Sequence, residues 1–156
     1  MTEIRKAENH DKPAIGQIIK AVIAGGDTYV FAPDTPEDDM MSYWFTPDKH
    51  NYVAVLDGEV VGTYWLRANN PGLGAHVGNG AYMVSPAAKG KGIGKQMAEH
   101  SIEEARRLGF ISIQFNFVVK SNTVARQPLE KRRLRDHRRD PGCVLSLKRK
   151  VSPMRT

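Results

Sequence analysis

Alternating side chains along residues 81–84 predict a β-strand near the middle of the chain. Proline cannot donate a hydrogen bond to a sheet, so this strand is expected to end at Ser85–Pro86. Ala81 and Met83 would then lie on one face of the sheet, with Tyr82 and Val84 on the other.

A helical pattern follows this strand after a short glycine-rich connection. Apolar residues recur at the spacing of one helix face, with Glu, Lys and Arg between them; they are Ile93, Met97, Ser101 or Ile102, Ala105 and Leu108. Gly109 is expected to end the helix, because glycine readily adopts the conformation found at helix C-termini. Residues 81–109 are therefore predicted to form a strand, a turn and a helix.

The rest of the chain predicts a mixed sheet with helices on its faces. Strands are predicted over residues 4–8, 51–56, 59–66 and 111–119, and helices near Pro13 and Pro36. Asp57–Gly58 is a strong hairpin signal, and Gly62 indicates a bulge or a close backbone approach. The element order is therefore β-α-α-β-β-β-α-β.

The composition indicates one domain, because 156 residues can bury a real core, and the single cysteine excludes an internal disulfide framework. We find no long apolar run and no signal peptide, so we expect a cytoplasmic protein without a membrane span. The charge is uneven, however. Residues 126–156 carry eleven Lys or Arg and three Asp or Glu, a net charge of +8, against −2 for residues 1–125.

The turn before the helix reads Lys89-Gly90-Lys91-Gly92-Ile93-Gly94-Lys95. The first turn of a helix offers backbone N–H groups without internal partners, and the helix dipole adds partial positive charge there. Glycines let a phosphate approach the backbone, and the lysines add full charges. The turn therefore predicts a pyrophosphate site, with a simple solvated loop as the alternative. The spacing fits neither the dinucleotide pattern G-x-G-x-x-G nor a P-loop, since Gln96 follows Lys95.

At these residues the chain resembles the GNAT superfamily of N-acetyltransferases, whose motif is Q/R-x-x-G-x-G/A after a strand ending in V-x-P. Here Val84-Ser85-Pro86 precedes the motif, and Lys89 stands in the place of glutamine or arginine. The resemblance implies that the turn from Lys89 to Lys95 holds the pyrophosphate of acetyl-CoA, the acetyl donor. It also implies that Met83 and Val84 bind the pantetheine arm through their backbone.

The same resemblance implies an α/β (α+β) fold with a mixed, mostly antiparallel central sheet and helices on both faces. The family builds its acceptor site partly from the region of Tyr43, Trp44 and Phe45, so these aromatic residues indicate either core packing or a wall of the substrate cleft. The partner implied is a small-molecule amine. GNAT proteins are often dimers, so a homodimer is among the assemblies that the resemblance implies.

Three asparagines sharpen the resemblance: Asn79, Asn116 and Asn122. An amide offers donors and an acceptor without titrating, so it can orient an amine or a carboxylate. Each asparagine has a structural alternative, such as a turn cap or a bond to the backbone. The segments H-V-x-N-G, F-N-F and S-N-T are similar to one GNAT branch that includes the yeast acetyltransferase of azetidine-2-carboxylate. That similarity implies substrate orientation by Asn79 and Asn116, with Asn122 toward the cofactor thioester.

The implied mechanism is direct attack of a neutral amine on the thioester, which requires a proton acceptor. His76 and Tyr82 are candidates for the base, and neither spacing is diagnostic. His100 is expected to face solvent from the helix, and Cys143 lies outside any catalytic pattern. We find no His, Cys and Asp spacing that would predict a metal site.

After Ala125 the chain leaves the family pattern. The family continues N-x-x-A-x-x-L-Y/W-x-x-x-G-F, and only Asn122 to Ala125 follow it. Pro128 then falls inside the expected helix, and arginine dominates the composition. We therefore divide the chain into a GNAT domain, residues 1–125, and a basic tail outside the family, residues 126–156. The last strands of the sheet are expected to be missing.

A frameshift would explain this break. Permitted codons from Gln127 onward, read one base out of register, restore L-W, then G-F and then an apolar strand at the family spacing. Our hypothesis is one added base near the Arg126 codon. Such a chain would keep the cofactor turn and have reduced or no turnover, because half of the core would be exposed.

Two other functions stay open. The chain could bind acetyl-CoA without catalysis, or the basic tail could attach an acetyltransferase-like body to nucleic acid. The tail has the charge for phosphate contacts, but it has no interleaved aromatic residues and no DNA-binding pattern. Nucleic acid is therefore not the partner that we expect.

Overall fold

The computed structural model describes residues 2–25, 31–115 and 143–147. Its helices are α1 (Lys12–Ile23), α2 (Glu37–Trp44) and α3 (Ile93–Arg107). Its strands are β1 (Thr2–Lys6), β2 (His50–Leu56), β3 (Glu59–Ala68), β4 (Val77–Val84), β5 (Ser112–Phe115) and β6 (Cys143–Ser146). Single 3₁₀ turns cover Asn9–Asp11, Gly72–Gly74 and Pro86–Ala88. The predicted order holds through β5, and residues 116–119 of the predicted last strand lie outside the described ranges.

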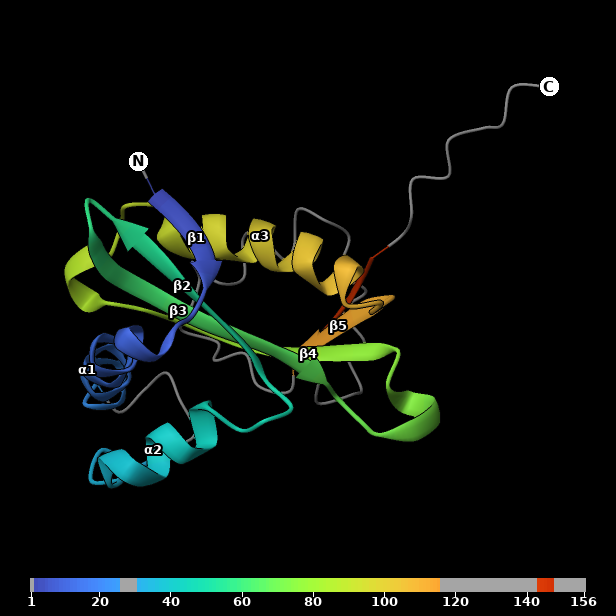
Figure 1. Ribbon diagram of the computed structural model, residues 1–156, viewed down its shortest axis with the longest axis horizontal. Helices are drawn as coiled ribbons and strands as arrows, with labels where there is room; N and C mark the ends of the chain where they lie inside the picture. The colour runs from blue at the N-terminus through green and yellow to red at the C-terminus, as the bar shows by residue number, and fades with distance from the viewer. Residues whose placement is uncertain (1, 26–30, 116–142, 148–156) are drawn as a thin grey trace.

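The strands form one sheet in the order β1-β2-β3-β4-β5-β6. Neighbouring strands are antiparallel except for β4 and β5, which are parallel. The parallel pair follows from α3, since a helix that crosses over the sheet returns the chain in the same direction. Figure 1 shows α3 on one face of the sheet and α1 with α2 on the other. The predicted mixed, mostly antiparallel sheet with helices on both faces is confirmed.

Each face of the sheet carries its own hydrophobic core. On the face covered by α3, Ile93, Met97 and Ala105 pack against strand residues that include Tyr64 and Leu66. On the face covered by α1 and α2, the apolar side of α1 packs with Trp44, Val53, Trp65 and Met83. The predicted faces of β4 are confirmed, because Tyr82 and Val84 join the first core, and Ala81 and Met83 the second. Trp44 is fully buried, which identifies core packing as the correct alternative for that residue.

The hairpin between β2 and β3 has the predicted turn. Asp57 and Gly58 both have positive φ angles, 53° and 87°, which is the conformation of the tight turn that suits twisted strands. The register shifts between Ala54, which pairs with Gly62, and Val55, which pairs with Val60, so Val61 is the extra residue of a β-bulge in β3. Gly62 lies beside this bulge, and a Cβ there would be 3.0 Å from Met97 Sδ. The structure therefore has both the bulge and the close approach to the backbone that the sequence indicated at Gly62.

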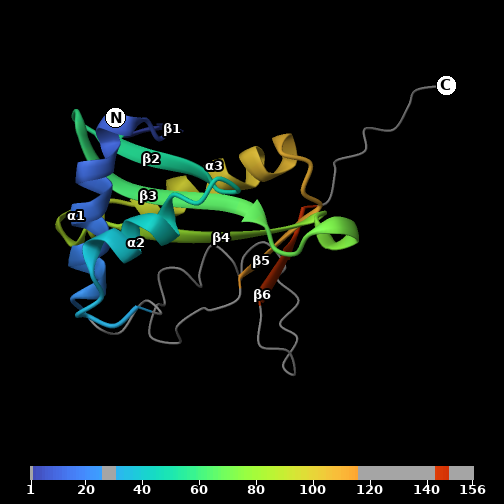
Figure 2. The same ribbon diagram turned by 60° about the horizontal axis from the view of Figure 1, so that its bottom comes forward.

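The sheet has a strand that we expected to be missing. Cys143–Ser146 pairs antiparallel with β5, and Leu147 N–H bonds the Ile111 carbonyl at 2.9 Å. Figure 2 shows β6 beside β5 at the edge of the sheet. The physical reason is that an edge strand presents unpaired N–H and C=O groups, which an extended segment of many different sequences can satisfy. The rest of the basic tail lies outside the described residues.

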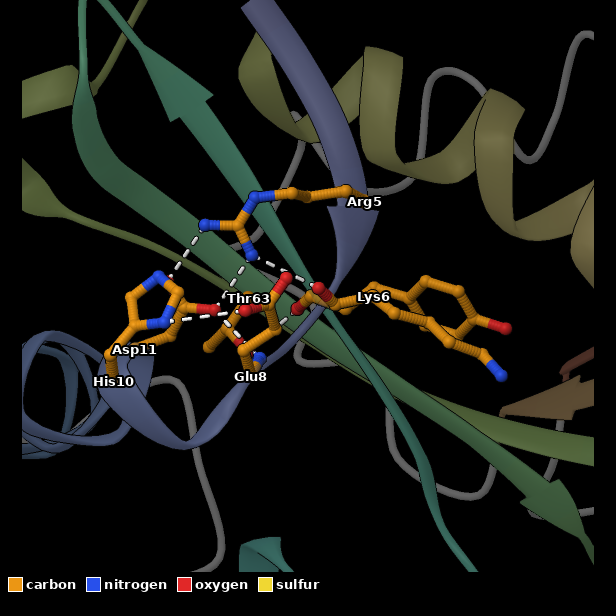
Figure 3. A network of polar contacts seen from close by, with 7 residues as sticks. Arg5, Lys6, Glu8, His10, Asp11 and Thr63 are labelled. Carbon is orange, nitrogen blue, oxygen red and sulfur yellow. Dashed lines mark hydrogen bonds and ion pairs between the residues drawn. The ribbon is translucent and has the colours of Figure 1, made fainter.

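A buried ion pair joins β1 to the start of α1 (Figure 3). Arg5 donates two hydrogen bonds to the carboxylate of Asp11, at 2.7 and 2.9 Å, and the Glu8 N–H donates a third, at 2.7 Å. Asp11 is only 2% exposed, and its hydrogen bond from Arg5 lowers its pKa below the usual value despite burial. The pair therefore positions the edge strand against the first helix.

Candidate active site

The glycine-rich turn between β4 and α3 has an open, positively charged geometry. Gly90 and Gly92 have φ angles of +84° and +76°, which glycine adopts without strain. A Cβ at Gly90 would meet no atom within 4 Å, so the backbone there is accessible to a ligand. The first intrahelical bond runs from Gln96 N–H to Gly92 C=O, which leaves the preceding N–H groups of the first turn without helical partners.

The side chains of this turn divide into an anchor and three cations. Ile93 is 1% exposed and packs into the α3 core, which holds the start of the helix against the sheet. Lys89, Lys91 and Lys95 are exposed around the turn. Gly94 lies next to β4, since a Cβ there would be 3.7 Å from Val84 Cγ2. First-turn N–H groups without helical partners, the helix dipole and three ammonium groups are the chemistry that the predicted pyrophosphate site requires.

Strand β4 leads into this turn, and β5 pairs only with the first residues of β4. The β4–β5 pairs end at Asn79 and Gln114, and Phe115 pairs with Cys143 on β6. From Gly80 to Val84, the β4 edge has no strand partner among the described residues. The predicted role of Met83 and Val84 needs such an edge, because a bound pantetheine arm would pair with their backbone.

Asn79 lies at the last point of this β4–β5 pairing. Its side chain is 6% exposed, and it forms no hydrogen bond within the part of the chain that the structure describes. The flanking glycines explain its orientation: a Cβ at Gly78 would be 2.9 Å from the Phe110 ring, and one at Gly80 would be 3.0 Å from the Trp65 carbonyl. Strand alternation places the Asn79 side chain on the same face as Ala81 and Met83, which is the face covered by α1 and α2. Asn116 and Asn122 lie outside the described residues.

The two candidates for the base, His76 and Tyr82, have different surroundings. His76 is exposed, and because a carbonyl can only accept, its Nδ1 must donate to the Leu73 carbonyl at 2.8 Å, leaving Nε2 as the acceptor. Tyr82 donates to Ser101 Oγ at 2.7 Å, and burial raises the pKa of Tyr82 to about 12. A phenol with this pKa stays protonated near neutral pH, so Tyr82 does not serve as the base.

His100 does not face solvent as the helical pattern predicted. Its side chain is half-buried, and its Nδ1 lies 2.6 Å from the Tyr64 hydroxyl. The helix turns His100 toward the sheet because Tyr52, Tyr64 and Tyr82 stack in a row beneath it. Tyr52 also donates to Glu104 at 2.9 Å, so this tyrosine row joins α3 to the sheet through polar as well as apolar contacts.

The sequence patterns missed a basic cluster at the end of β3. Lys49 is 8% exposed, contacts the Tyr43 carbonyl, and lies over the rings of Tyr43 and Trp65 at 3.5 and 4.5 Å from their centroids. Burial, together with the smaller effect of the positive charge of Arg67, lowers the pKa of Lys49 to about 8. Arg67 pairs with Asp48 at 3.2 Å. Alternation along β3 places Arg67 on the same face as Trp65. This was the only feature of the sequence that could have indicated the basic cluster.

Two negative findings apply to the described residues alone. No group of three or more His, Cys, Asp and Glu side chains there could hold a metal ion. No helix in the same part of the chain is long and apolar enough to cross a membrane.

Comparisons with known proteins agree with this geometry. The model of the acetyltransferase (GNAT) family matches residues 21–133. N-acetyltransferase aca1 of Schizosaccharomyces pombe is 38% identical over 63 residues, which are 40% of this chain and 30% of that protein. The chain thus matches less than a third of the length of that curated relative.

Solved structures extend the likeness over most of the chain. A GCN5-related N-acetyltransferase from Kribbella flavida has 38% sequence identity and a TM-score of 0.78, covering 83% of this chain and 80% of its own. A phosphinothricin acetyltransferase from Sinorhizobium meliloti, solved in complex with AcCoA, has 20% identity and a TM-score of 0.71. That alignment covers 83% of this chain and 72% of the other, and at this identity it shows a shared fold.

Proposed function

Because the chain belongs to the acetyltransferase (GNAT) family, a family that uses acetyl-CoA, we propose that it transfers acetyl to the amine of a small, amino-acid-like acceptor. One observation carries the proposal. The open glycine turn at the start of α3 adjoins the β4 edge from Gly80 to Val84, which has no strand partner among the described residues, and Asn79, which is 6% exposed, lies where that edge begins. A site for phosphates, a site for an extended arm and a polar group for an acceptor thus follow one another along a single strand.

The residues present fit acetyl-CoA. The N–H groups and lysines of the turn from Lys89 to Lys95 would hold the pyrophosphate. The backbone of Met83 and Val84, on the uncovered edge of β4, would pair with the pantetheine arm. When bound, acetyl-CoA supplies the thioester whose acetyl group is transferred. Phosphinothricin acetyltransferases among the structural neighbours give some support to an amino-acid-like acceptor.

The chemistry asked of the protein is positioning and charge stabilisation. The acceptor nitrogen forms a bond to the acetyl carbon, the carbon–sulfur bond breaks, and the proton lost by nitrogen reaches the sulfur through water. Asn79, and by resemblance Asn116, would orient the amine, with Asn122 toward the thioester. Backbone N–H groups along the same stretch of β4 would stabilise negative charge on the carbonyl oxygen.

The proposal predicts acetyl transfer from acetyl-CoA to small amino acids or cyclic imino acids, measured by release of the CoA thiol. Replacing Asn79 with alanine should lower kcat/KM for the acceptor about tenfold, because the hydrogen bond that would orient the amine is lost. The KM for acetyl-CoA should change little, since the glycine turn is untouched.

Asn70 provides the matched control, because it is an exposed asparagine in the loop between β3 and β4. Asn70→Ala should keep full activity. Equal losses in both variants would contradict the role of Asn79, and transfer to none of the amines in the panel would contradict the proposed function itself.

The tail is part of the proposal. We propose that residues 1–125 are the acetyltransferase domain and that residues from about 126 onward arise from one added base. Sequencing codons 120–130 in the source genome and in the expressed clone tests this directly. A chain restored to the other frame should turn over faster than the present chain by at least about tenfold, toward a typical rate of about 10 per second. Equal rates, or a genome that encodes the tail as written, would contradict the frameshift.

The branch of the family, the location in the cell and the assembly of the protein are also part of the proposal. The likeness of the asparagine segments supports the proposal that the chain belongs to the branch resembling the yeast azetidine-2-carboxylate acetyltransferase. We propose further that it works in the cytoplasm, and a homodimer is among the assemblies that we expect. Azetidine-2-carboxylate and proline are therefore the first acceptors to assay, and size-exclusion chromatography gives the assembly.

A further inference from the structure

Three polar side chains form a row across the sheet on the face covered by α1 and α2. Arg67 on β3 is the register partner of Asn79 on β4, and Asn79 is the register partner of Gln114 on β5. Direct register partners share one face of a sheet, and their Cβ atoms lie about 5 Å apart. The row therefore places a guanidinium beside the amide that the proposed function assigns to the acceptor.

The charges around this row do not cancel. Arg67 and Lys49 are close enough for the charge of Arg67 to lower the pKa of Lys49, and Asp48 is the only acidic group among the interactions found for the pair. Two cations and one carboxylate leave one excess positive charge when Lys49 is protonated. Lys49 is 8% exposed, and the Arg67 side chain is 34% exposed, so water reaches Arg67 more easily than Lys49.

Arg67 also has hydrogen-bond donors that its contact with Asp48 does not use. Asp48 takes a single hydrogen bond from Nη1 at 3.2 Å, and the Asp48 side chain is 57% exposed, so the pair is weak and can be replaced. Among the described residues, neither the buried Nε of Arg67 nor the buried Nε1 of the neighbouring Trp65 has a hydrogen-bond partner. Cζ of Arg67 lies 5.6 Å from the Trp65 ring centroid, within the range of a cation–π contact.

We propose that Arg67 binds a carboxylate of the acceptor, so that the acceptor is an amino or imino acid and a simple amine is a poor substrate. This inference rests on the proposed function and adds the residue that selects the substrate. A carboxylate at Arg67 would balance the excess charge and take up the unused donors, as planar guanidinium groups favour two parallel bonds to carboxylates. Asn79, one strand away, would then face the part of the acceptor that carries the amine.

The test is a binding titration that does not depend on turnover. The chain has two tryptophans, and Trp65 lies against Arg67, so intrinsic fluorescence reports an occupied site. Glycine, alanine, proline and azetidine-2-carboxylate are each titrated against the corresponding carboxamide in the presence of CoA. At least one acid should bind about tenfold or more tightly than its amide. Arg67→Met should reduce that preference to about one, and Arg67→Lys should keep part of it.

Arg107→Met is the matched control, because Arg107 is an exposed arginine at the end of α3 that pairs with Glu104. It should leave the preference for the acid unchanged. No preference in the unaltered chain, or a preference that survives in Arg67→Met, would overturn the inference. Arg67→Gln gives the same comparison if the methionine variant does not fold.

Release of the CoA thiol with the same compounds separates the two claims. If the acids are acetylated and Arg67→Met still prefers acids over carboxamides, the role of Arg67 is contradicted and the proposed function is supported. If the preference for a carboxylate requires Arg67 but no acid is acetylated, the proposed function is contradicted and the binding role of Arg67 is supported.

Discussion

Replacing Gly90 with alanine is expected to weaken the binding of acetyl-CoA by about ten- to a hundredfold. The backbone at this position has a φ of +84°, and a side chain there would project into the open space that the pyrophosphate would occupy. Loss of close approach removes hydrogen bonds to a doubly charged group, each worth about 1.5–3 kcal/mol. The dissociation constant from isothermal titration calorimetry measures the effect.

Gly58 allows the backbone strain to be separated from the effect on binding. It has a φ of +87° at the β2–β3 hairpin, and a Cβ there would also meet no atom within 4 Å. Alanine at either position should lower the free energy of unfolding by about 1–2 kcal/mol, the cost of a left-handed conformation for a residue with a Cβ. Only Gly90→Ala should change the affinity for acetyl-CoA. Unaltered affinity in Gly90→Ala would remove the turn from the proposed cofactor site.

Replacing Asp11 with alanine is expected to lower the free energy of unfolding by about 3 kcal/mol, because it removes the buried partner of Arg5 and the acceptor for the Glu8 N–H. Asp11→Asn should have a smaller effect, since the amide oxygen still accepts one bond. Urea unfolding followed by circular dichroism measures both. A double-mutant cycle with Arg5→Met isolates the energy of the pair.

The contribution of Asp11 should also depend on pH in a defined direction. Its pKa is lowered by the Arg5 hydrogen bond, so the folded state favours the ionised form. The stabilisation is then complete above the unfolded pKa of about 4 and is lost as the pH falls through the lower folded value. The stability difference between the unaltered chain and Asp11→Ala should therefore shrink on acidification. Asp34→Ala, which alters an exposed acid in the connection before α2, should show neither effect.

The sequence alone determined the features whose signals are local. The alternation of residues 81–84, the glycine turn and the helical spacing up to Gly109 each depend on near neighbours along the chain, and the structure has them where they were predicted. The Asp57–Gly58 hairpin is equally local, because the turn conformation itself sets the pairing of β2 with β3. The glycine turn was the part of the candidate site that local pattern could supply.

Only the tertiary structure decided which distant residues meet. The register of β3, β4 and β5 aligned Arg67 with Asn79 and Gln114, and no spacing along the chain encodes that row. Packing of α3 onto a row of tyrosines turned His100 away from solvent. The open edge of β5 paired with Cys143–Ser146 despite a tail without family pattern, because backbone hydrogen bonding depends little on side-chain identity. Pairing register and helix packing are long-range choices, and they assembled the acceptor side of the candidate site.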